Sequence, residues 1–551
     1  MSVQPPALSL PIPQSDDDVD VLVVGGGING VGIARDLAGR GWRVLLAERD
    51  DLASHTSSSS TKLIHGGLRY LEYYEFGLVR KALQEREVLL KSAPHIMWPL
   101  RFVMPHDGAM RPGWMIRIGL FLYDHLARRE VLPGSAGVDL RTSPLGKPLK
   151  PQYQRGFVYS DGWVDDARLV LLNALDARDK GAKVLTRSPV TAVQRAADAW
   201  TATVQTPRGE RTVKARALVN AAGPWAESFL RGIARSAQGE TLATKNLRLV
   251  KGSHIVVRRC FEHDHAYIFQ NPDKRIIFAI PYERDYTLIG TTDVELPQHA
   301  ISGANGEARR AEIDVGEIAY LCEQASRYFA RPVTPGDVVW SYAGVRPLLD
   351  EGAAGKAGDP SAVTRDYLLE TNTQGAPLLS VWGGKITTFR KLAEDAADLV
   401  GDMLGDRRSA WTEQAFLPGG DLSEWIGAPS RPDTDFERLV QAIQQRHAWL
   451  PPTLTHRLAR AYGSRVGRVL AAAKSLADLG QEVAPGLHAA ELRYLIEEEW
   501  VCNAVDALWR RSKLGLHYTE AQRRAVNTWF DEHLEEINRH RHDQQESLRC
   551  N

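Results

Sequence analysis

Three glycines near the start of the chain have the spacing that a bound dinucleotide requires. Gly25, Gly27 and Gly30 fill the glycine positions of G-x-G-x-x-G after the apolar run 21–24. The first allows a tight turn, the second lets the backbone approach a pyrophosphate, and the third lets a helix pack close to the preceding strand. Glu48 stands at the carboxylate position of this fingerprint and can accept hydrogen bonds from ribose hydroxyls. These residues predict a dinucleotide site and leave NAD and FAD as alternatives.

The glycines can act together only if the chain places them at the end of a strand. Residues 19–50 have the pattern of a β-α-β unit, in which an apolar strand, the glycine turn and a helix precede a second apolar strand ending at Glu48. The N-terminal N–H groups of such a helix point at the phosphates of the ligand. A glycine-rich turn without a ligand is the alternative, but it does not require this order of strand, turn, helix and carboxylate.

Composition limits the classes of function. The chain has 551 residues, with 68 Lys and Arg against 68 Asp and Glu, so its formal net charge is zero. This balance argues against a nucleic-acid-binding protein, and any anion site must come from local clustering of cations. Four scattered cysteines without metal-ligand spacing predict a reduced compartment and no metal site. We find neither a secretory signal nor an apolar run long enough to span a bilayer.

Changes of pattern along the chain predict an α/β protein in three parts. Residues 1–18, proline-rich and then acidic, are expected to form a disordered tail, and 19–403 to hold a Rossmann-like dinucleotide-binding domain. Short β-rich runs between about 240 and 340 predict an antiparallel-sheet substrate domain interleaved with it. Residues 404–551 have mainly helical patterns and predict an α-helical C-terminal cap domain.

Two further segments favour FAD over NAD. Residues 218–225 form a strand running into a small-residue turn, which resembles the second dinucleotide signature of FAD oxidoreductases. Residues 381–388 resemble the C-terminal flavin motif, a glycine turn before a helix whose N-terminus faces the isoalloxazine. An NAD-linked Rossmann enzyme needs neither segment, so the predicted cofactor is FAD.

Several longer motifs point to one family. They are residues 56–70 (TSSSSTKLIHGGLRY), 163–169 (WVDDARL), 251–254 (KGSH), 289–293 (IGTTD), 344–347 (GVRP) and 506–511 (DALWRR). In this order they resemble the FAD-dependent, quinone-linked glycerol-3-phosphate dehydrogenases of the bacterial aerobic type. The resemblance implies oxidation of glycerol 3-phosphate to dihydroxyacetone phosphate, with a hydride passing from C2 to flavin N5. It also implies ubiquinone or another quinone as acceptor, attachment to the inner face of the cytoplasmic membrane, and a possible homodimer.

The same motifs supply the expected FAD contacts. A neutral glycine turn, small residues at strand ends, and hydroxyl and backbone donors suit a pyrophosphate and a flavin ring. The expected cofactor residues are Gly25, Gly27, Asn29, Gly30, Glu48, Ser57, Ser58, His65, Gly66, Gly67, Ala222, Gly223, Trp225, Gly384 and Thr387.

A phosphate dianion in a chain without net charge needs a local group of cations. Arginine suits phosphate because its planar fork binds two oxygens at once. Matching family motifs give Arg69, Arg346, Arg365 and Lys385 as candidates, with Tyr70 as a further hydroxyl donor. A lysine near the flavin pyrimidine ring can also stabilise the reduced anionic flavin, which is a second role for Lys385.

Removal of the hydroxyl proton requires a base, and His254 is the first candidate. Imidazole titrates near neutrality and can take up the proton. His65 is the rival, and a cationic site could also work with a water as base, because cations lower the pKa of a bound hydroxyl. The neighbouring carboxylates Asp165 and Asp166 are interpreted as caps of the following helix, because hydride transfer needs no carboxylate pair.

Residues 111–129 are one candidate for membrane attachment, and the C-terminal helices, which carry further Arg and Trp, are also candidates. Residues 111–129 combine large apolar side chains with flanking arginines, as in helices that lie in a membrane interface. A helix packed in the protein core is the equal alternative.

Three other functions remain possible from the sequence. A glycerol-3-phosphate oxidase, which passes electrons to oxygen, needs nearly the same site. An amino-acid or 2-hydroxy-acid oxidase needs one arginine for a carboxylate and no cluster for a dianion. A non-catalytic flavin-binding scaffold needs no substrate arginines at all.

Overall fold

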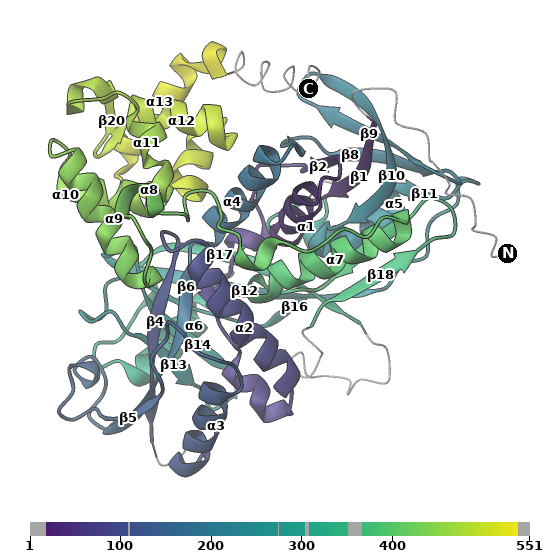
Figure 1. Ribbon diagram of the computed structural model, residues 1–551. Coiled ribbons are helices and arrows are strands. Elements are labelled where there is room, and N and C mark those ends of the chain that lie inside the picture. Colours follow the sequence, from purple (N-terminus) through teal and green to yellow (C-terminus); the bar gives the residue numbers. More distant parts are fainter. Residues whose placement is uncertain (1–17, 108–110, 274, 304–307, 351–365, 538–551) are drawn as a thin grey trace.

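The computed structural model describes residues 18–107, 111–273, 275–303, 308–350 and 366–537. The tail expected over residues 1–18 therefore lies outside the described residues, apart from Asp18, which begins the first strand. Two large sheets and a C-terminal group of helices make up the described chain (Figure 1). The predicted α/β architecture, with an FAD-type Rossmann unit, an antiparallel sheet and a helical C-terminal part, is confirmed.

The first sheet has nine strands and a parallel centre. Its main order is β11 (Ala234–Arg235), β8 (Val190–Arg195), β9 (Trp200–Thr206), β10 (Gly209–Asn220), β1 (Asp18–Val24), β2 (Val44–Ala47) and β7 (Lys183–Leu185). Strand β19 (Leu378–Trp382) pairs in parallel with β10 and antiparallel with β18 (Leu368–Asn372). Because β1, β2, β10 and β19 run in parallel, their carboxyl ends lie at one edge, where ligands of such sheets bind.

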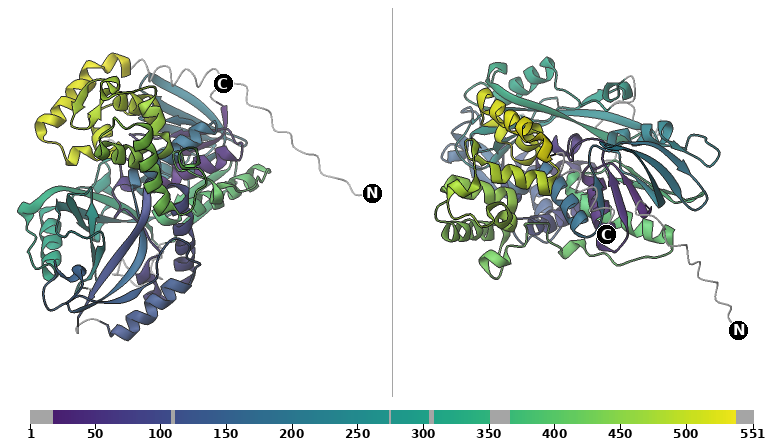
Figure 2. Two further views of the ribbon diagram at one scale, coloured as in Figure 1. Left: turned by 60° about the vertical axis from the view of Figure 1, so that its left-hand side comes forward. Right: turned by 90° about the horizontal axis from the view of Figure 1, so that it is seen from above.

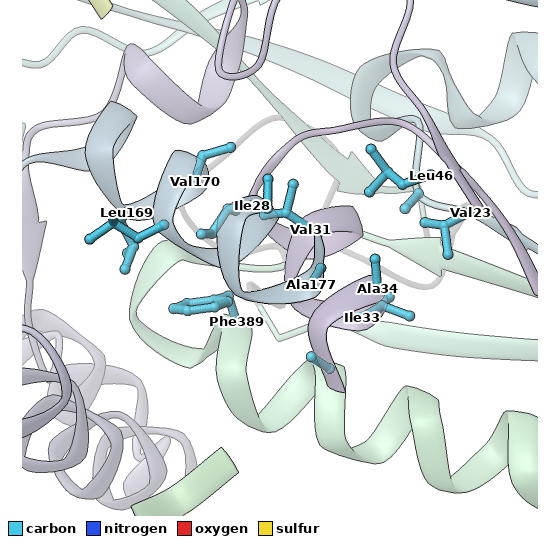
Figure 3. Close-up of a cluster of buried hydrophobic side chains, with 14 of the residues drawn as sticks. Val23, Ile28, Val31, Ile33, Ala34, Leu46, Leu169, Val170, Ala177 and Phe389 are labelled. Carbon is cyan, nitrogen blue, oxygen red and sulfur yellow. The ribbon is translucent and has the colours of Figure 1, made fainter. Parts of the chain in front are cut away.

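Both faces of this sheet are covered, which explains the continuous apolar run in β1. Val21 and Val23 pack into a cluster with helices α1 (Ile28–Gly39), α4 (Asp166–Asp179) and α7 (Phe389–Leu404) (Figure 3). Leu22 and Val24 pack on the opposite face, against β8, β9 and α5 (Ala226–Gly232). A strand buried on both faces needs apolar residues at successive positions.

The second sheet is mostly antiparallel and has ten strands. Its main order is β16 (Val294–Leu296), β12 (Leu247–Arg258), β15 (Tyr286–Gly290), β14 (Ile276–Tyr282), β13 (Ala266–Gln270), β4 (Met97–His106), β6 (Arg155–Val164) and β3 (Leu63–Ile64). Strand β17 (Val338–Leu349) pairs with β12, and β5 (Ala136–Asp139) pairs with β6. The sheet therefore draws strands from two stretches, 63–164 and 247–349, and reaches further toward the N-terminus than the expected range of about 240–340.

Helices cover both faces of the second sheet. Helix α6 (Val315–Tyr328) contributes to one buried cluster, while α2 (Phe76–Ser92) and α3 (Gly113–His125) contribute to the other. In Figures 1 and 2, α3 lies at the end of the molecule farthest from the C-terminal helices.

The C-terminal part has its own hydrophobic core. It contains α8 (Ser423–Ile426), α9 (Pro432–Arg446), α10 (Pro452–Tyr462), α11 (Val466–Leu470), α12 (Ala489–Glu499), the π-helix η13 (Asp506–Arg511), α13 (Glu520–Glu532) and the small hairpin β20 (Glu482–Ala484) and β21 (Leu487–His488). The helical pattern of residues 488–510 predicts one long helix, but α12 ends where Trp500 adopts a left-handed backbone. In the described part of the chain, no helix is both long and apolar enough to cross a bilayer.

Candidate functional site

The glycine turn has the close backbone contacts that its fingerprint requires. Gly25 adopts a φ of +106°, and a Cβ there would lie 2.6 Å from the carbonyl oxygen of Ala221 at the end of β10. A Cβ at Gly30 would lie 1.8 Å from the carbonyl oxygen of Gly25. No other residue type fits these two positions without moving the backbone. The turn thus brings the N-terminus of α1 to the carboxyl edge of the parallel sheet.

Glu48 holds the glycine turn from the end of β2. Its two carboxylate oxygens accept hydrogen bonds from the backbone N–H groups of Gly26, at 2.6 Å, and Asp50, at 2.8 Å. Burial raises the pKa of Glu48 above its ordinary value, and the two N–H donors oppose that rise. Among the described residues, Glu48, Asp50 and His55 are a group with carboxylate and imidazole atoms within 4.8 Å of one another. His55 already pairs with Asp50 at 2.7 Å, so protein contacts account for this group.

A short 3₁₀ helix, η1 (Thr56–Ser58), lies against the start of α1. The Oγ of Ser57 accepts a hydrogen bond from the N–H of Ile28 at 3.0 Å, in the first turn of that helix. The Oγ of Ser58 donates to the carbonyl of His55. Thr56 donates to the carbonyl of Val345, which fixes η1 on β17 of the second sheet. The serine run is therefore an ordered bridge between the two sheets.

The residues around Asn29 fit the flavin end of FAD. Asn29 donates to the carbonyl of Gly383 at 3.1 Å, while its Oδ1 is buried with no partner among the described residues. Gly383 and Gly384 have positive φ angles of +75° and +105°, so the chain turns there in a conformation that favours glycine. A buried acceptor without a donor, beside a glycine turn and a helix N-terminus, suits a ligand with N–H groups.

A second turn carries His65, Gly66 and Gly67 toward the same place. The N–H of His65 donates to Thr387 Oγ at 3.2 Å, next to the Gly384 turn. The N–H of Gly66 donates to the hydroxyl of Tyr123 at 2.8 Å. Gly67 has a φ of +76°, which lets the chain enter the 3₁₀ helix η2 (Leu68–Tyr73). The expected flavin residues of three distant segments are thus brought together.

The small-residue end of β10 lines the other side of the glycine turn. Asn220 accepts a hydrogen bond from the N–H of Ala222, and Gly223 has a φ of +56°. Trp225 donates its indole N–H to the carbonyl of Ile301 at 3.0 Å. A cavity of about 510 Å³ extends from Trp225 and Ser58 along β17 toward the C-terminal helices. It adjoins the cofactor residues and belongs to the same site.

The predicted substrate cations form two groups. Arg346 on β17 donates to Thr291 Oγ at 2.9 Å and pairs with Asp293. The ammonium of Lys385 lies 4.0 Å from the ring centre of Tyr70, which follows Arg69 in η2. The backbone segments that carry the two groups lie close together. A Cβ at Gly383, two residues before Lys385, would lie 3.7 Å from the carbonyl oxygen of Pro347, which follows Arg346. The remaining predicted cation, Arg365, lies outside the described residues.

His254 is held in place in this site, and its surroundings favour the neutral imidazole. It is 2% exposed, its Nε2 shares a hydrogen bond of 2.9 Å with Thr61, and its ring stacks on Tyr342. Burial, followed by the nearby charges of Lys62 and Arg346, lowers the pKa of His254 well below its ordinary 6.5. A neutral imidazole is the form that can accept a proton.

Sequence reasoning missed a buried ion pair beside His254. The ammonium of Lys62 is fully buried and lies 2.8 Å and 2.9 Å from the two carboxylate oxygens of Asp166. The cap interpretation is correct for Asp165, whose carboxylate accepts the N–H of Arg168. Asp166 instead bonds Lys62 and both the N–H and hydroxyl of Ser60, and so fixes the serine run. The partners are 104 residues apart in the sequence, so no local pattern predicts that they pair.

Known proteins match nearly the whole chain in sequence. Residues 20–390 match the family model of FAD dependent oxidoreductases, and residues 410–544 match the C-terminal domain of alpha-glycerophosphate oxidase. D-erythritol 1-phosphate dehydrogenase of Brucella abortus is 49% identical over 93% of this chain and 97% of its own length. Aerobic glycerol-3-phosphate dehydrogenase of Escherichia coli is 45% identical over 94% of this chain and 98% of its own.

A solved structure agrees with these relatives. Glycerol-3-phosphate dehydrogenase from Bacillus halodurans, complexed with FAD, superposes with a TM-score of 0.72 at 28% identity, covering 97% of this chain and 95% of its own. The resemblance found in the motifs is confirmed. The glycine turn, the surroundings of Asn29 and the family matches all indicate FAD as the cofactor. This chain therefore belongs to the FAD dependent oxidoreductases, in the group that carries the C-terminal domain of alpha-glycerophosphate oxidase.

Proposed function

We propose that this protein oxidises glycerol 3-phosphate to dihydroxyacetone phosphate and passes the electrons to a membrane quinone. The observation that supports this most is the position of two groups beside the segments that fit FAD: Arg346 lies near His254, and Lys385 lies over the ring of Tyr70. The names of the relatives support a substrate that combines a phosphate with a secondary alcohol.

Each group has a separate task in this proposal. Arg346 and Arg69 bind the phosphate, since an arginine fork offers two N–H donors to its oxygens. Arg346 is already oriented by Thr291 and Asp293, so little side-chain freedom is lost when a phosphate binds. Lys385 adds positive charge, and Arg365 is the fourth proposed cation. Bound FAD supplies the hydride acceptor, next to Asn29 and Gly384.

His254 is the proposed base for the C2 hydroxyl. Its replacement by glutamine should lower kcat about 100-fold or more, the usual contribution of a positioned base. Because the pKa of His254 is lowered, its protonation should limit the rate only below pH 6.5 in the wild-type enzyme. The pH dependence of kcat/KM tests this: the acidic decline should disappear in H254Q. An unchanged decline would assign the proton to His65 or to a water.

Anaerobic titration tests the proposed reaction directly. Adding glycerol 3-phosphate to the FAD-loaded protein without oxygen should bleach the flavin absorbance, and a quinone analogue should restore it. A scaffold without turnover would not bleach. An oxidase would consume oxygen and form peroxide as fast without quinone as with it, whereas a dehydrogenase would need the quinone.

D-erythritol 1-phosphate is a second candidate substrate. The relative named for it matches this chain at 49% identity, a similarity as high as that of the glycerol-3-phosphate dehydrogenases at 45–48%. Both compounds offer a phosphate to the same cations but differ in the length of the polyol. The ratio of their kcat/KM values in the bleaching assay decides between them, because specificity is a ratio of these constants.

A further inference from the structure

His254 is closed to direct contact with a bound molecule. The residue is 2% exposed, and its Nδ1 is buried with no partner among the described residues. Its Nε2 lies 2.9 Å from the Oγ of Thr61, which is within the reach of direct proton transfer. Thr61 itself is only partly buried. In this arrangement a proton from a substrate reaches the imidazole through the hydroxyl of Thr61.

The backbone on both sides of Thr61 is anchored. Asp166 accepts hydrogen bonds from the N–H of Ser60, at 3.1 Å, and from its hydroxyl, at 2.7 Å. The same carboxylate pairs with the buried ammonium of Lys62 at 2.8 Å. The carbonyl of Ser60 accepts a hydrogen bond from the hydroxyl of Tyr342, whose ring stacks on the imidazole. The hydroxyl of Thr61 is thus held in place against its partner.

The proposed phosphate contact lies beside this pair. Gly252 precedes His254 by two positions on β12, so the two residues face the same side of the sheet. A Cβ at Gly252 would lie 2.5 Å from Nη2 of Arg346, so the missing side chain leaves room for the guanidinium. A substrate whose phosphate contacts Arg346 brings its neighbouring hydroxyl to the part of the site that Thr61 and His254 border.

We propose that Thr61 is a proton relay between the substrate hydroxyl and His254. The O–H proton of the substrate passes to Thr61 Oγ while the hydroxyl proton of Thr61 passes to Nε2 of His254. The C2–H bond breaks as a hydride, which leaves for the acceptor that FAD supplies, and the C2=O bond forms. The imidazole ends as an imidazolium. The relay rests on the proposed function and adds a catalytic residue to it.

The charges around this contact favour the transfer. They come from two ion pairs, Lys62–Asp166 and Arg346–Asp293. Burial, and then the two cations, lower the pKa of His254, so the imidazole is neutral and can accept a proton. Positive charge also stabilises the negative charge that develops on the hydroxyl oxygens during transfer. The neighbouring hydroxyl of Tyr342 stays protonated, because burial raises its pKa well above 10.

Removal of the Thr61 hydroxyl tests the relay in the full-length, FAD-loaded protein. Thr61→Val keeps the shape of the side chain and should lower the rate of anaerobic flavin reduction by glycerol 3-phosphate about 100-fold, the usual contribution of a positioned base. Thr61→Ser keeps the hydroxyl and should keep most of the rate. The decline of this rate below pH 6.5 should disappear in T61V and remain in T61S. The double variant of T61V and H254Q should be no slower than H254Q, because groups that act as a unit are not additive.

Thr287→Val is the matched control. Thr287 is a fully buried threonine of the same sheet, on β15, and its Oγ accepts a hydrogen bond from the N–H of Cys260 outside the proposed site. The flavin of T287V should be reduced at the wild-type rate. A loss as large as that of T61V would assign the effect to the packing of the sheet and overturn the relay.

The resting tautomer of His254 gives a second measurement that needs no turnover. For Thr61 to donate its proton, Nε2 must be unprotonated and Nδ1 must carry the hydrogen. Heteronuclear NMR of histidine-labelled protein, with H254Q to assign the signal, should show this tautomer in the wild type and a different balance of tautomers in T61V. Hydrogen on Nε2 in the wild type would overturn the relay.

The outcomes separate the relay from the function. If glycerol 3-phosphate bleaches the wild type and T61V equally fast, the function stands and the relay is overturned. The relay is also overturned if T61S is as slow as T61V, or if the acidic decline persists in T61V. If neither glycerol 3-phosphate nor D-erythritol 1-phosphate bleaches the wild type, the proposed function fails and the relay fails with it.

Discussion

Replacing Arg346 by glutamine should lower kcat/KM for glycerol 3-phosphate about 100- to 1000-fold, because one charge-assisted, two-pronged contact to the phosphate is lost. The kcat/KM of Arg346→Lys should lie between those of the wild type and the glutamine variant, since lysine keeps the charge but not the planar fork. The loss should be smaller for a substrate analogue that lacks the phosphate. Steady-state kinetics with a soluble acceptor, normalised to flavin content, measure all three effects.

A second arginine on the same sheet provides the control. Arg248 on β12 pairs with Glu295 on β16 much as Arg346 on β17 pairs with Asp293, but Glu295 is 51% exposed where Asp293 is 24% exposed, and neither Arg248 nor Glu295 belongs to the proposed site. Arg248→Gln should leave kcat/KM within about twofold of the wild type, as expected of an exposed pair. If R248Q lost as much activity as R346Q, the effect would come from the sheet, and Arg346 would not be the phosphate contact.

Local patterns predicted those parts of the fold that local geometry determines. The glycine turn, Glu48 and the strand ends could be predicted because each requires a particular residue type at a fixed spacing. The patterns of residues 78–92 and 165–180 each predict a helix, and α2 and α4 begin and end within two residues of these ranges. The N-cap at Asp165 was also predictable, since it depends on an N–H only three residues away.

Long-range pairings could not be predicted in the same way. The second sheet joins β4 to β13, which are separated by about 160 residues of sequence, and the periodicity of neither strand predicts that they pair. The Lys62–Asp166 pair could not be predicted for the same reason, since each residue, taken alone in the sequence, looks like an exposed charge. Helix α3 shows a third case: its sequence fitted both a core and a membrane interface, and only its packing shows that one face is buried and the other exposed.

The largest expected effect on stability comes from Asp51, which joins the nucleotide-binding unit to the C-terminal helices. Its carboxylate is 3% exposed and accepts hydrogen bonds from Arg511, at 2.8 Å to each of two nitrogens, and from Arg510 at 2.6 Å. Asp51→Asn leaves the buried Arg511 without its paired carboxylate, while Arg510 keeps its pair with Asp506. We expect a loss of about 3–5 kcal/mol, the usual cost of breaking a buried ion pair. Chemical denaturation measures this loss. The result is an apparent free energy of unfolding, because the protein has several hydrophobic cores.

The pH dependence gives an independent signature of the same group. Burial opposes ionisation, but Arg511, Arg510 and Arg187 lower the pKa of Asp51 from 3.8 to about 2. The charged form is therefore favoured in the folded state, so its stabilisation is complete above about pH 4 and is lost as the pH falls toward 2. The acid-induced loss of stability should be smaller in D51N than in the wild type.

Asp139 separates the effect of burial from that of the pKa. Its carboxylate also has a pKa lowered to about 2, by hydrogen bonds from Arg141, but this pair is exposed at the surface. Asp139→Asn should leave the denaturation midpoint unchanged, because water screens an exposed pair and replaces the lost contact. Equal destabilisation in D139N and D51N would show that the lowered pKa is sufficient. A large effect confined to D51N would show that the cost arises from the charge of Arg511, left buried and unpaired between the nucleotide-binding unit and the C-terminal helices.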